Sequence, residues 1–516
     1  MALNDRSGGS GVDGIPADYF APRVPATRIW LRTAAVVTVV AALVAAGVLM
    51  RDTLTGACGG LGSGLTRVDG ECVGVSAEAA GHYFSDDLRS VQDAIAREND
   101  RVHREWQQDN RRRYVKVALL SPLTATETSF MTSNQILHAV QGAYVAQWRA
   151  NHTQDLDDRS PLIQLVLASE GSRQAEWRRV VRQLEEMADD EHPLVAVIGM
   201  GTSIDATKAA AEYLSASASA LPMVGAVTTA DELRAIRGFV RVSPSDTDYV
   251  AALADYLKRR GRPPVGMLVH DTAEPDLYVR DLRKAYKEQL EAYLLDEEKS
   301  FSGAADPSKA RPQMFNPVIE GICDRRPDLV LYAGRALDLD EFVAALAVRT
   351  CRDKPIEILV GATGLGGFER LRDTLVDGRI TIVNAAAVDP RWFAGGGDPK
   401  SRPEHLPRFV TAFQEQVGGV EALTDGYAVV HHDAMATAVK AIRIAARPLL
   451  ADQVPAAVDV RAQLANLNSG SIVRGAGGDL SFNSRRQADP VGKWVPVVTV
   501  PASSGGDRPA PIFVTR

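Results

Sequence analysis

The chain has 516 residues, of which 45% are hydrophobic and 24% are charged, and its formal net charge at pH 7 is -7. This composition is typical of a globular protein, and the length exceeds what one ordinary core needs, so we expect two lobes with additional segments. The acidic balance offers no basic face of the kind that nucleic-acid binding requires, and no nucleic-acid partner is expected.

The N-terminal region contains one long apolar segment. Residues 29–50 carry a single charge, at Arg32, and have about the 20-residue length that a membrane-spanning helix needs. Three arginines lie in the stretch that ends at Arg32, whereas Arg51 is followed at once by an aspartate, and this basic excess places the N-terminus in the cytoplasm. We therefore predict a disordered cytoplasmic tail over residues 1–28, a transmembrane helix over residues 29–50 and an extracytoplasmic main domain, which makes this a single-pass protein of the cell membrane. A cleaved signal peptide is the alternative.

Four cysteines fall into two local pairs, Cys58 with Cys72 and Cys323 with Cys351. In oxidising extracytoplasmic surroundings such pairs form disulfides. Four reduced thiols are the alternative, and a zinc site is disfavoured because no CxxC spacing or neighbouring histidine completes one. Residues 54–58 (LTGAC) also resemble a lipoprotein processing box with Cys58 as the lipidated residue, although Thr55 stands where such boxes prefer leucine.

A long amphipathic helix is predicted between residue 76 and residue 113. Its apolar residues recur mostly at spacings of four and three, which is the heptad signature: Phe84, Leu88, Val91, Ile95, Val102 and Trp106. Such a helix either forms a dimerising stalk, which would make the protein a homodimer, or packs as a satellite on the main domain. Residues 51–113 are therefore assigned to a disulfide loop followed by this helix.

From residue 114 onward, short apolar strands alternate with amphipathic helices, a pattern typical of α/β folds whose parallel sheets are covered on both faces. After residue 450 the alternation ends, and two closing strands, 472–482 and 494–500, are predicted to be antiparallel edge strands. The earlier strands are predicted at residues 114–120, 163–168, 194–199, 223–226, 265–269, 329–332, 356–361 and 380–384.

The order of several segments resembles one known family, the leucine and branched-chain amino-acid-binding branch of the type I periplasmic-binding proteins. This family includes substrate-binding proteins of ABC transporters and ligand-binding domains of receptors. The resemblance covers residues 114–500. The segments that carry it are 117–124 (VALLSPLT), 199–203 (GMGTS), 221–233 (LPMVGAVTTADEL), 240–246 (VRVSPSD), 276–278 (DLY) and 474–482 (RGAGGDLSF).

The resemblance implies an α/β, two-lobe type I periplasmic-binding fold, with parallel sheets flanked by helices and a hinge of three crossings, preceded here by the transmembrane helix. We expect lobe 1 over residues 114–242 plus 384–450, and lobe 2 over residues 243–383 plus 451–500. Residues 501–516 are expected to form a flexible tail.

The resemblance also implies a ligand site between the lobes. The family presents a serine at the start of a helix, which corresponds to Ser203, and a threonine that contacts the ligand, which corresponds to Thr229. Helices that begin just after parallel strands point backbone N–H groups into the crevice at the strands' carboxyl edge, which supports these positions independently. The full set of candidate ligand-binding residues is Ser121, Thr202, Ser203, Thr228, Thr229, Tyr278, Arg335 and Thr363.

Each of these residues has a simpler structural interpretation. The hydroxyls can cap helices, Tyr278 can pack the surface between the lobes, and Arg335 can form a salt bridge between the lobes instead of binding an anion. Thr363 stands where amino-acid-binding members carry an acidic residue that meets the ligand's amine. This departure weakens an amino-acid ligand, so an amino acid and another small polar or anionic solute both stay open.

No motif of a catalytic site is found: there is no GxSxG, HExxH, phosphate-binding or dinucleotide-binding pattern. Neighbouring His431 and His432 on a helix point about 100° apart and cannot easily share one metal ion. We therefore expect no enzyme, no cofactor and no metal. The expected function is capture of a small molecule by hinge closure, as the substrate-binding component of an ABC importer. The alternative is a ligand-sensing surface receptor domain that signals to a membrane partner without transport.

Overall fold

The structure is a computed structural model that describes residues 38–40, 58, 63–76, 82–260, 262–272, 276–303, 313–393, 399–450, 453–468, 470–501 and 511–516. The chain divides into two compact units, residues 1–56 and residues 57–516. Of the first unit only the helical residues 38–40 are described, so the predicted cytoplasmic tail and nearly all of the predicted transmembrane helix lie outside the described residues. Among the helices that are described, none has both the length and the apolar composition needed to cross a bilayer.

The second unit contains two sheets of seven strands each. The first sheet has the order β1-β2-β4-β3-β5-β6-β7, in which β3 to β7 run parallel and β1 and β2 are antiparallel additions at one edge. Its strands are β1 (Leu65–Val68), β2 (Glu71–Ser76), β3 (Tyr114–Ser121), β4 (Leu162–Ser169), β5 (Leu194–Thr202), β6 (Met223–Val227) and β7 (Phe239–Arg241).

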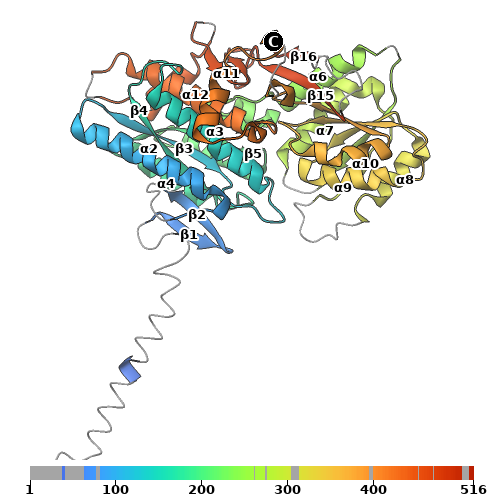
Figure 1. Cartoon of the computed structure of the whole chain (residues 1–516), viewed down its shortest axis with the longest axis horizontal. Coiled ribbons are helices and arrows are strands. Elements are labelled where there is room, and N and C mark those ends of the chain that lie inside the picture. The colour runs from blue at the N-terminus through green and yellow to red at the C-terminus, as the bar shows by residue number, and fades with distance from the viewer. Residues whose placement is uncertain are drawn as a thin grey trace, which may run out of the picture. The chain divides into compact units, whose positions relative to one another are not determined.

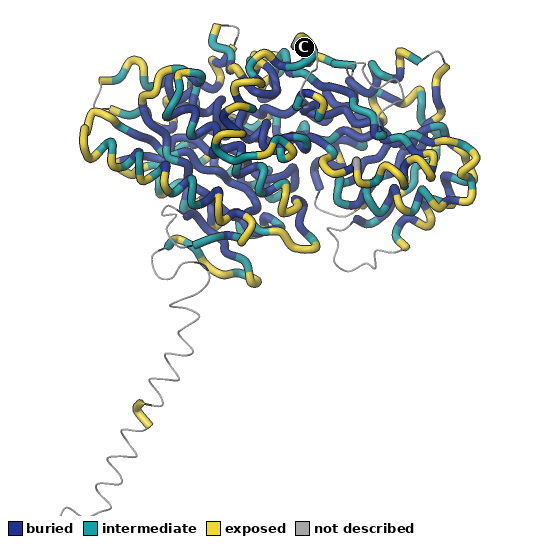
Figure 2. The backbone as a smooth tube through the Cα atoms, viewed as in Figure 1, coloured by how far each residue is buried: buried dark blue, intermediate teal, exposed yellow. Residues whose placement is uncertain are grey.

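Helices cover both faces of this first sheet, which together with them forms lobe 1 (Figure 1). One apolar core joins the sheet to α2 (Arg89–Gln108), α3 (Ser133–His152), α11 (Leu406–Gln416) and α12 (Tyr427–Ala446). A second core on the opposite face joins it to α4 (Trp177–Glu186) and α5 (Asp205–Ala216). This double coverage explains why the central strands are almost uninterrupted apolar runs. Figure 2 shows the sheets buried and the outer helix surfaces exposed.

The second sheet has the order β16-β15-β12-β11-β10-β8-β9 and forms lobe 2. Strands β8 to β12 are parallel, and β15 and β16 are antiparallel additions. The strands are β8 (Gly266–Asp271), β9 (Lys299–Phe301), β10 (Leu329–Ala333), β11 (Ile356–Gly361), β12 (Ile380–Ala385), β15 (Trp494–Val500) and β16 (Ile512–Val514). One face packs on α6 (Asp246–Lys258) and α7 (Leu277–Leu290), and the other on α8 (Asn316–Arg325), α9 (Ala336–Ala347) and α10 (Arg372–Asp377).

The segment before residue 114 is part of lobe 1. Strands β1 and β2 extend its sheet through the pairing of β2 with β4, although these residues were expected to form only a disulfide loop. The heptad-like residues of α2, such as Ile95 and Val102, are buried against the same lobe. Helix α2 is therefore a satellite helix, and its apolar face is covered within the chain.

The end of the chain also differs from the expected boundaries. Helix α13 (Ala457–Leu464) and the two-stranded hairpin of β13 (Val473–Gly475) and β14 (Gly478–Leu480) contribute to the core around α12, so they belong to lobe 1 and not to lobe 2. Strand β15 then enters lobe 2, where β16 pairs with it. The predicted flexible tail thus contains a paired strand, because the apolar residues Ile512 and Phe513 complete the edge that β15 would leave open.

Both predicted disulfides are confirmed. Cys58 bonds to Cys72 with Cα atoms 5.2 Å apart, and Cys323 bonds to Cys351 with Cα atoms 5.4 Å apart. The first bond occupies the Cys58 sulfur, which lipidation would need. The second joins α8 to the turn after α9 within lobe 2.

Candidate functional site

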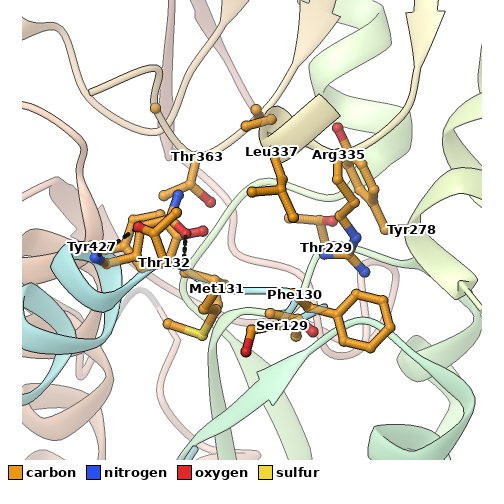
Figure 3. A pocket seen from close by; sticks show the side chains of 16 residues that line it. Ser129, Phe130, Met131, Thr132, Thr229, Tyr278, Arg335, Leu337, Thr363 and Tyr427 are labelled. Carbon is orange, nitrogen blue, oxygen red and sulfur yellow. Dashed lines mark hydrogen bonds between the residues drawn. The ribbon is translucent and has the colours of Figure 1, made fainter. Parts of the chain in front are cut away.

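A cavity of about 60 Å³ lies between the two lobes, at the carboxyl edges of their parallel strands (Figure 3). Lobe 1 contributes the loop before α3, the ends of β5 and β6, and the start of α12, while lobe 2 contributes the starts of α7 and α9 and the loop after β11. At about 10–15 Å³ for each water-sized position, this cavity holds roughly four to six waters or a solute of similar size.

The N-terminus of α3 opens onto this cavity. Thr132 caps the helix: its hydroxyl accepts a hydrogen bond from the Gln135 backbone N–H at 3.3 Å, and the Gln135 side-chain oxygen accepts one from the Thr132 N–H at 3.0 Å. This T-x-x-Q capping box satisfies two N–H groups that the helix leaves unpaired. Ser129 and Phe130, in the loop before the helix, also line the cavity. The positive end of the α3 dipole therefore faces the cavity.

Two predicted threonines line the lobe 1 wall. Thr202 ends β5, where its N–H and its hydroxyl both donate to the side-chain oxygen of Gln174, at 2.9 Å each. The neighbouring Gly201 has a φ of +59°, and a Cβ there would lie 2.3 Å from the Gln174 amide nitrogen, so the tight turn at the end of β5 requires glycine. Thr229 follows β6 and also lines the cavity. Both hydroxyls therefore sit where helices and loops leave the sheet.

Behind this wall lies a buried carboxyl group, Glu170, at the end of β4. A Cβ at Gly201 would lie 2.7 Å from its Oε1, which places it directly against the β5 turn. Burial raises the pKa of the Glu170 carboxyl to about 8. At neutral pH this side chain is therefore mainly protonated and adds little negative charge to the lobe 1 wall.

Among the described residues that line the cavity, Arg335 is the one with a cationic side chain, and it contacts both lobes. Its guanidinium donates to both oxygens of Asp276 in its own lobe, at 2.7 and 2.8 Å, and to the backbone carbonyl of Ser203 in lobe 1, at 3.1 Å. It also lies over the rings of Phe130 and Tyr278, with 5.1 and 5.0 Å to the ring centroids. Burial opposes its charge, but Asp276 outweighs burial and raises the pKa of the guanidinium.

The remaining lobe 2 wall consists of Tyr278 and the loop after β11. The Tyr278 hydroxyl donates to the Gly361 carbonyl at 2.9 Å, so the ring, and not the hydroxyl, is available to a solute. In the loop, Thr363 and Gly364 line the cavity. A Cβ at Gly364 would lie 2.3 Å from the Asp425 carbonyl oxygen, so this glycine allows lobe 2 to approach the start of α12 closely.

The structure thus brings together five of the eight predicted residues: Thr202, Thr229, Tyr278, Arg335 and Thr363. The other three do not line the cavity. The Ser203 hydroxyl accepts hydrogen bonds from the backbone N–H groups of Thr229, at 2.8 Å, and Ala230, at 3.1 Å, which ties two loops of lobe 1 together.

Ser121 and Thr228 are turned away from the cavity for different reasons. The Ser121 hydroxyl is buried 3.9 Å from the sulfur of Met131, and Met131 itself is the lining residue. Thr228 packs on the backbone of Gly225, where a Cβ would come within 1.9 Å of its Oγ1.

Several lining residues were missed: Ser129, Phe130, Met131, Thr132, Gln135, Leu337 and Tyr427. The T-x-x-Q spacing after the first strand is a capping signal that could have placed a second helix N-terminus at the crevice. No comparable signal identifies Tyr427, which reaches the cavity because lobe 1 is built from two distant parts of the chain.

Buried polar groups also occur in α12, away from the cavity. His432 lies between Asp433, at 2.9 Å, and Arg149, at 2.7 Å, and it is fully buried. Asp433 in turn accepts from the backbone N–H groups of Ala476, at 2.6 Å, and Gly477, at 2.9 Å. These contacts hold the β13–β14 hairpin on α12. Within the described residues, no three His, Cys, Asp or Glu side chains gather as metal ligands.

Comparison with known proteins gives a clear result for structure only. No family model matches the sequence. No curated protein matches it either. A leucine-binding protein from Thermotoga maritima superposes with a TM-score of 0.56 at 16% identity, over 78% of this chain and 98% of that chain.

Two further solved structures have the same architecture. A branched-chain amino-acid transporter substrate-binding protein from Streptococcus pneumoniae, in complex with isoleucine, superposes with a TM-score of 0.54 at 15% identity, over 78% of this chain and 99% of that chain. A solute-binding protein of an ABC transporter from R. palustris, in complex with 4-hydroxybenzoate, superposes with a TM-score of 0.56 at 15% identity, over 78% of this chain and 97% of that chain. This chain therefore has the type I periplasmic-binding fold.

Proposed function

We propose that this chain is an extracytoplasmic solute-binding protein, tethered to the cell membrane by residues 29–50, that captures a small molecule between its lobes and delivers it to an ABC permease. The observation that carries the proposal is the polar cavity at the facing carboxyl edges of the two sheets. Solved proteins of the same fold hold isoleucine and 4-hydroxybenzoate. In such folds, ligands bind where strand ends and helix N-termini face a crevice.

The lining indicates the chemistry of the solute. Hydroxyl groups of Ser129, Thr132, Thr202, Thr229 and Thr363 surround the cavity, and none of its described lining residues is Asp or Glu. The ammonium group of an amino acid would be buried there without a carboxylate, which is costly. Hydroxyls and the α3 N-terminus favour instead a small polar or singly anionic solute without an amine, such as a short hydroxy acid.

Import is preferred over sensing for a structural reason. A dimerising stalk would favour sensing, but the apolar face of α2 is buried on lobe 1, and the described part of the chain contains no such stalk. Binding without chemical change is preferred over catalysis because the structural neighbours are substrate-binding proteins.

A thermal-shift screen of the full chain in mild detergent tests this proposal. Hydroxy acids, short carboxylic acids, neutral polyols and amino acids are compared at equal concentration. A solute present at 100 times its dissociation constant adds about 2.7 kcal/mol of stability. We expect the largest shift from an amine-free acid or polyol. Larger shifts from amino acids would contradict the proposed solute chemistry, and a flat screen would contradict solute binding itself.

A further inference from the structure

A second pocket lies on lobe 1, near the amino ends of strands β3 and β4, whereas the interlobe cavity lies at the carboxyl ends of the strands. It has a volume of about 340 Å³, within the range of small-molecule sites. The last turns of α2, the turn before β3, the end of α3 and the start of β4 form its walls, and these elements lie together in Figure 1. The solute bound between the lobes would not reach it.

Arginines dominate this pocket. Arg101, Arg111, Arg112, Arg113 and Arg159 line it, against only two carboxylates, Glu105 and Asp158, so the lining carries an excess of three positive charges. Carboxylates of the protein pair with three of these guanidinium groups, and the positive charge of the other two would be offset by an anion bound in the pocket.

Three of these arginines are held in place by carboxylates. Arg101 lies between Glu98, at 2.6 Å, and Glu105, which also pairs with Arg112. Arg113 lies 3.9 Å from Glu191 and has a buried Nε without a hydrogen-bond partner in the described residues. The side chains of Arg101 and Arg113 are only 25% and 24% exposed, so the pocket floor is fixed before a ligand arrives.

The other two arginines remain available. No carboxylate in the described residues lies within salt-bridge distance of Arg111 or Arg159, which are exposed at the rim of the pocket. Their planar guanidinium groups can each donate two parallel hydrogen bonds to an oxyanion. A fixed floor with exposed cationic side chains at the rim is suited to an anion that offers several oxygens and more than one charge.

From this arrangement we infer that the arginine pocket binds a phosphate group. Phosphate matches the charge excess and the number of donors better than a single carboxylate does. The group belongs either to a free phosphate or phosphomonoester, or to the headgroup of an anionic lipid. The inference does not depend on the solute between the lobes.

Calorimetric titration of the full chain in mild detergent tests the inference. The probes are inorganic phosphate, a glycerol monophosphate and the soluble short-chain lipid dihexanoyl phosphatidylglycerol, at constant ionic strength set with chloride. The test variant is Arg111→Gln with Arg159→Gln. The control is Arg97→Gln with Arg104→Gln: both residues are exposed on α2, lie outside the pocket and have no ion partner among the described residues, so the change in net charge is the same.

We expect saturable binding of at least one probe, weakened at least about tenfold in the test variant and unchanged in the control. Binding of phosphate or the monophosphate identifies a free ligand, and binding of the lipid alone identifies a headgroup. No saturable binding of any probe, an equal loss in both variants, or no loss in a test variant that melts like the wild type would each overturn the inference.

Discussion

Arg335 is expected to hold the lobes together, so its removal should weaken solute binding without abolishing the fold. Of its contacts, the two hydrogen bonds to Asp276 stay within lobe 2, whereas the bond to the Ser203 carbonyl and the ring of Phe130 cross to lobe 1. Only the crossing contacts favour the closed arrangement, because the Asp276 bonds are present whether the lobes are open or closed.

The expected magnitude follows from those two crossing contacts. A hydrogen bond from a charged donor contributes about 1.5 kcal/mol at the low end, and a cation–π contact contributes about 0.5 kcal/mol more. Arg335→Gln should therefore shift the equilibrium between closed and open lobes by about 2 kcal/mol, and weaken solute binding by up to about 30-fold. Most of the loss should appear as faster dissociation, because the lobes reopen more readily.

The assay is calorimetric titration with the solute that the thermal-shift screen identifies, together with stopped-flow dissociation rates. The matched control is Arg283→Gln, which breaks a pair with Glu298 in lobe 2 and no contact with lobe 1. Equal effects of the two substitutions, or an Arg335→Gln variant that binds as tightly as the wild type, would refute a role for Arg335 in closure.

Three further predictions concern the same lobes. Thr229→Val should lower solute affinity about fivefold in calorimetry. Ser203→Ala should mainly lower the free energy of urea unfolding, by about 1–3 kcal/mol, because two buried N–H groups lose their acceptor. The reverse pattern would contradict the assigned roles. Burial raises the pKa of Glu170 in the folded state from 4.5 to about 8, so the unfolded chain loses this proton first and wild-type stability falls as the pH rises through that window. Glu170→Gln should reduce the fall between pH 5 and pH 8 by up to about 4 kcal/mol in unfolding curves. An equal fall in the two proteins would count against this role. Replacing Cys323 and Cys351 by serine opens a loop of 28 residues and should lower the free energy of unfolding by about 3.5 kcal/mol. Solute affinity should stay unchanged, because neither residue lines the cavity. A loss of affinity would contradict the view that this disulfide stabilises lobe 2 without acting on the site.

The architecture could largely be predicted from the sequence because its strands are buried on both faces. Runs such as residues 194–199 have no polar interruption, and a parallel sheet covered by helices is the usual setting for them. Both disulfides were accessible for a similar reason, since each joins cysteines close in sequence. These features depend on local patterns.

The boundaries of the two lobes were harder to predict because they depend on contacts between segments that are distant in the sequence. Strand β2 joins lobe 1 by pairing with β4, about ninety residues further along the chain, and α13 returns to lobe 1 after the alternating pattern has ended. The heptad spacing of α2 did not distinguish a partner helix from the chain's own sheet. A practical consequence is that a soluble fragment should begin before Cys58, because a start after β2 would remove β1, β2 and the first disulfide.

The sequence predicted which segments reach the site, but not which of their side chains line the cavity. Residues after strands β5 and β6 were placed at the crevice, yet of the neighbours Thr228 and Thr229 only the second lines the cavity, because Thr228 packs on Gly225. The direction of a hydroxyl in a loop depends on which backbone groups need a partner, as at Ser203, and those partners come from other loops.

The most direct test of solute capture by closure is the distance between the lobes in solution. Spin labels at cysteines introduced at Leu450 in lobe 1 and Val348 in lobe 2, two exposed positions, report this distance by pulsed electron paramagnetic resonance. A saturating solute should shift the distribution to a shorter, narrower peak, and Arg335→Gln should shift it back toward longer distances. A distribution that a saturating solute leaves unchanged would contradict closure around a ligand between the lobes.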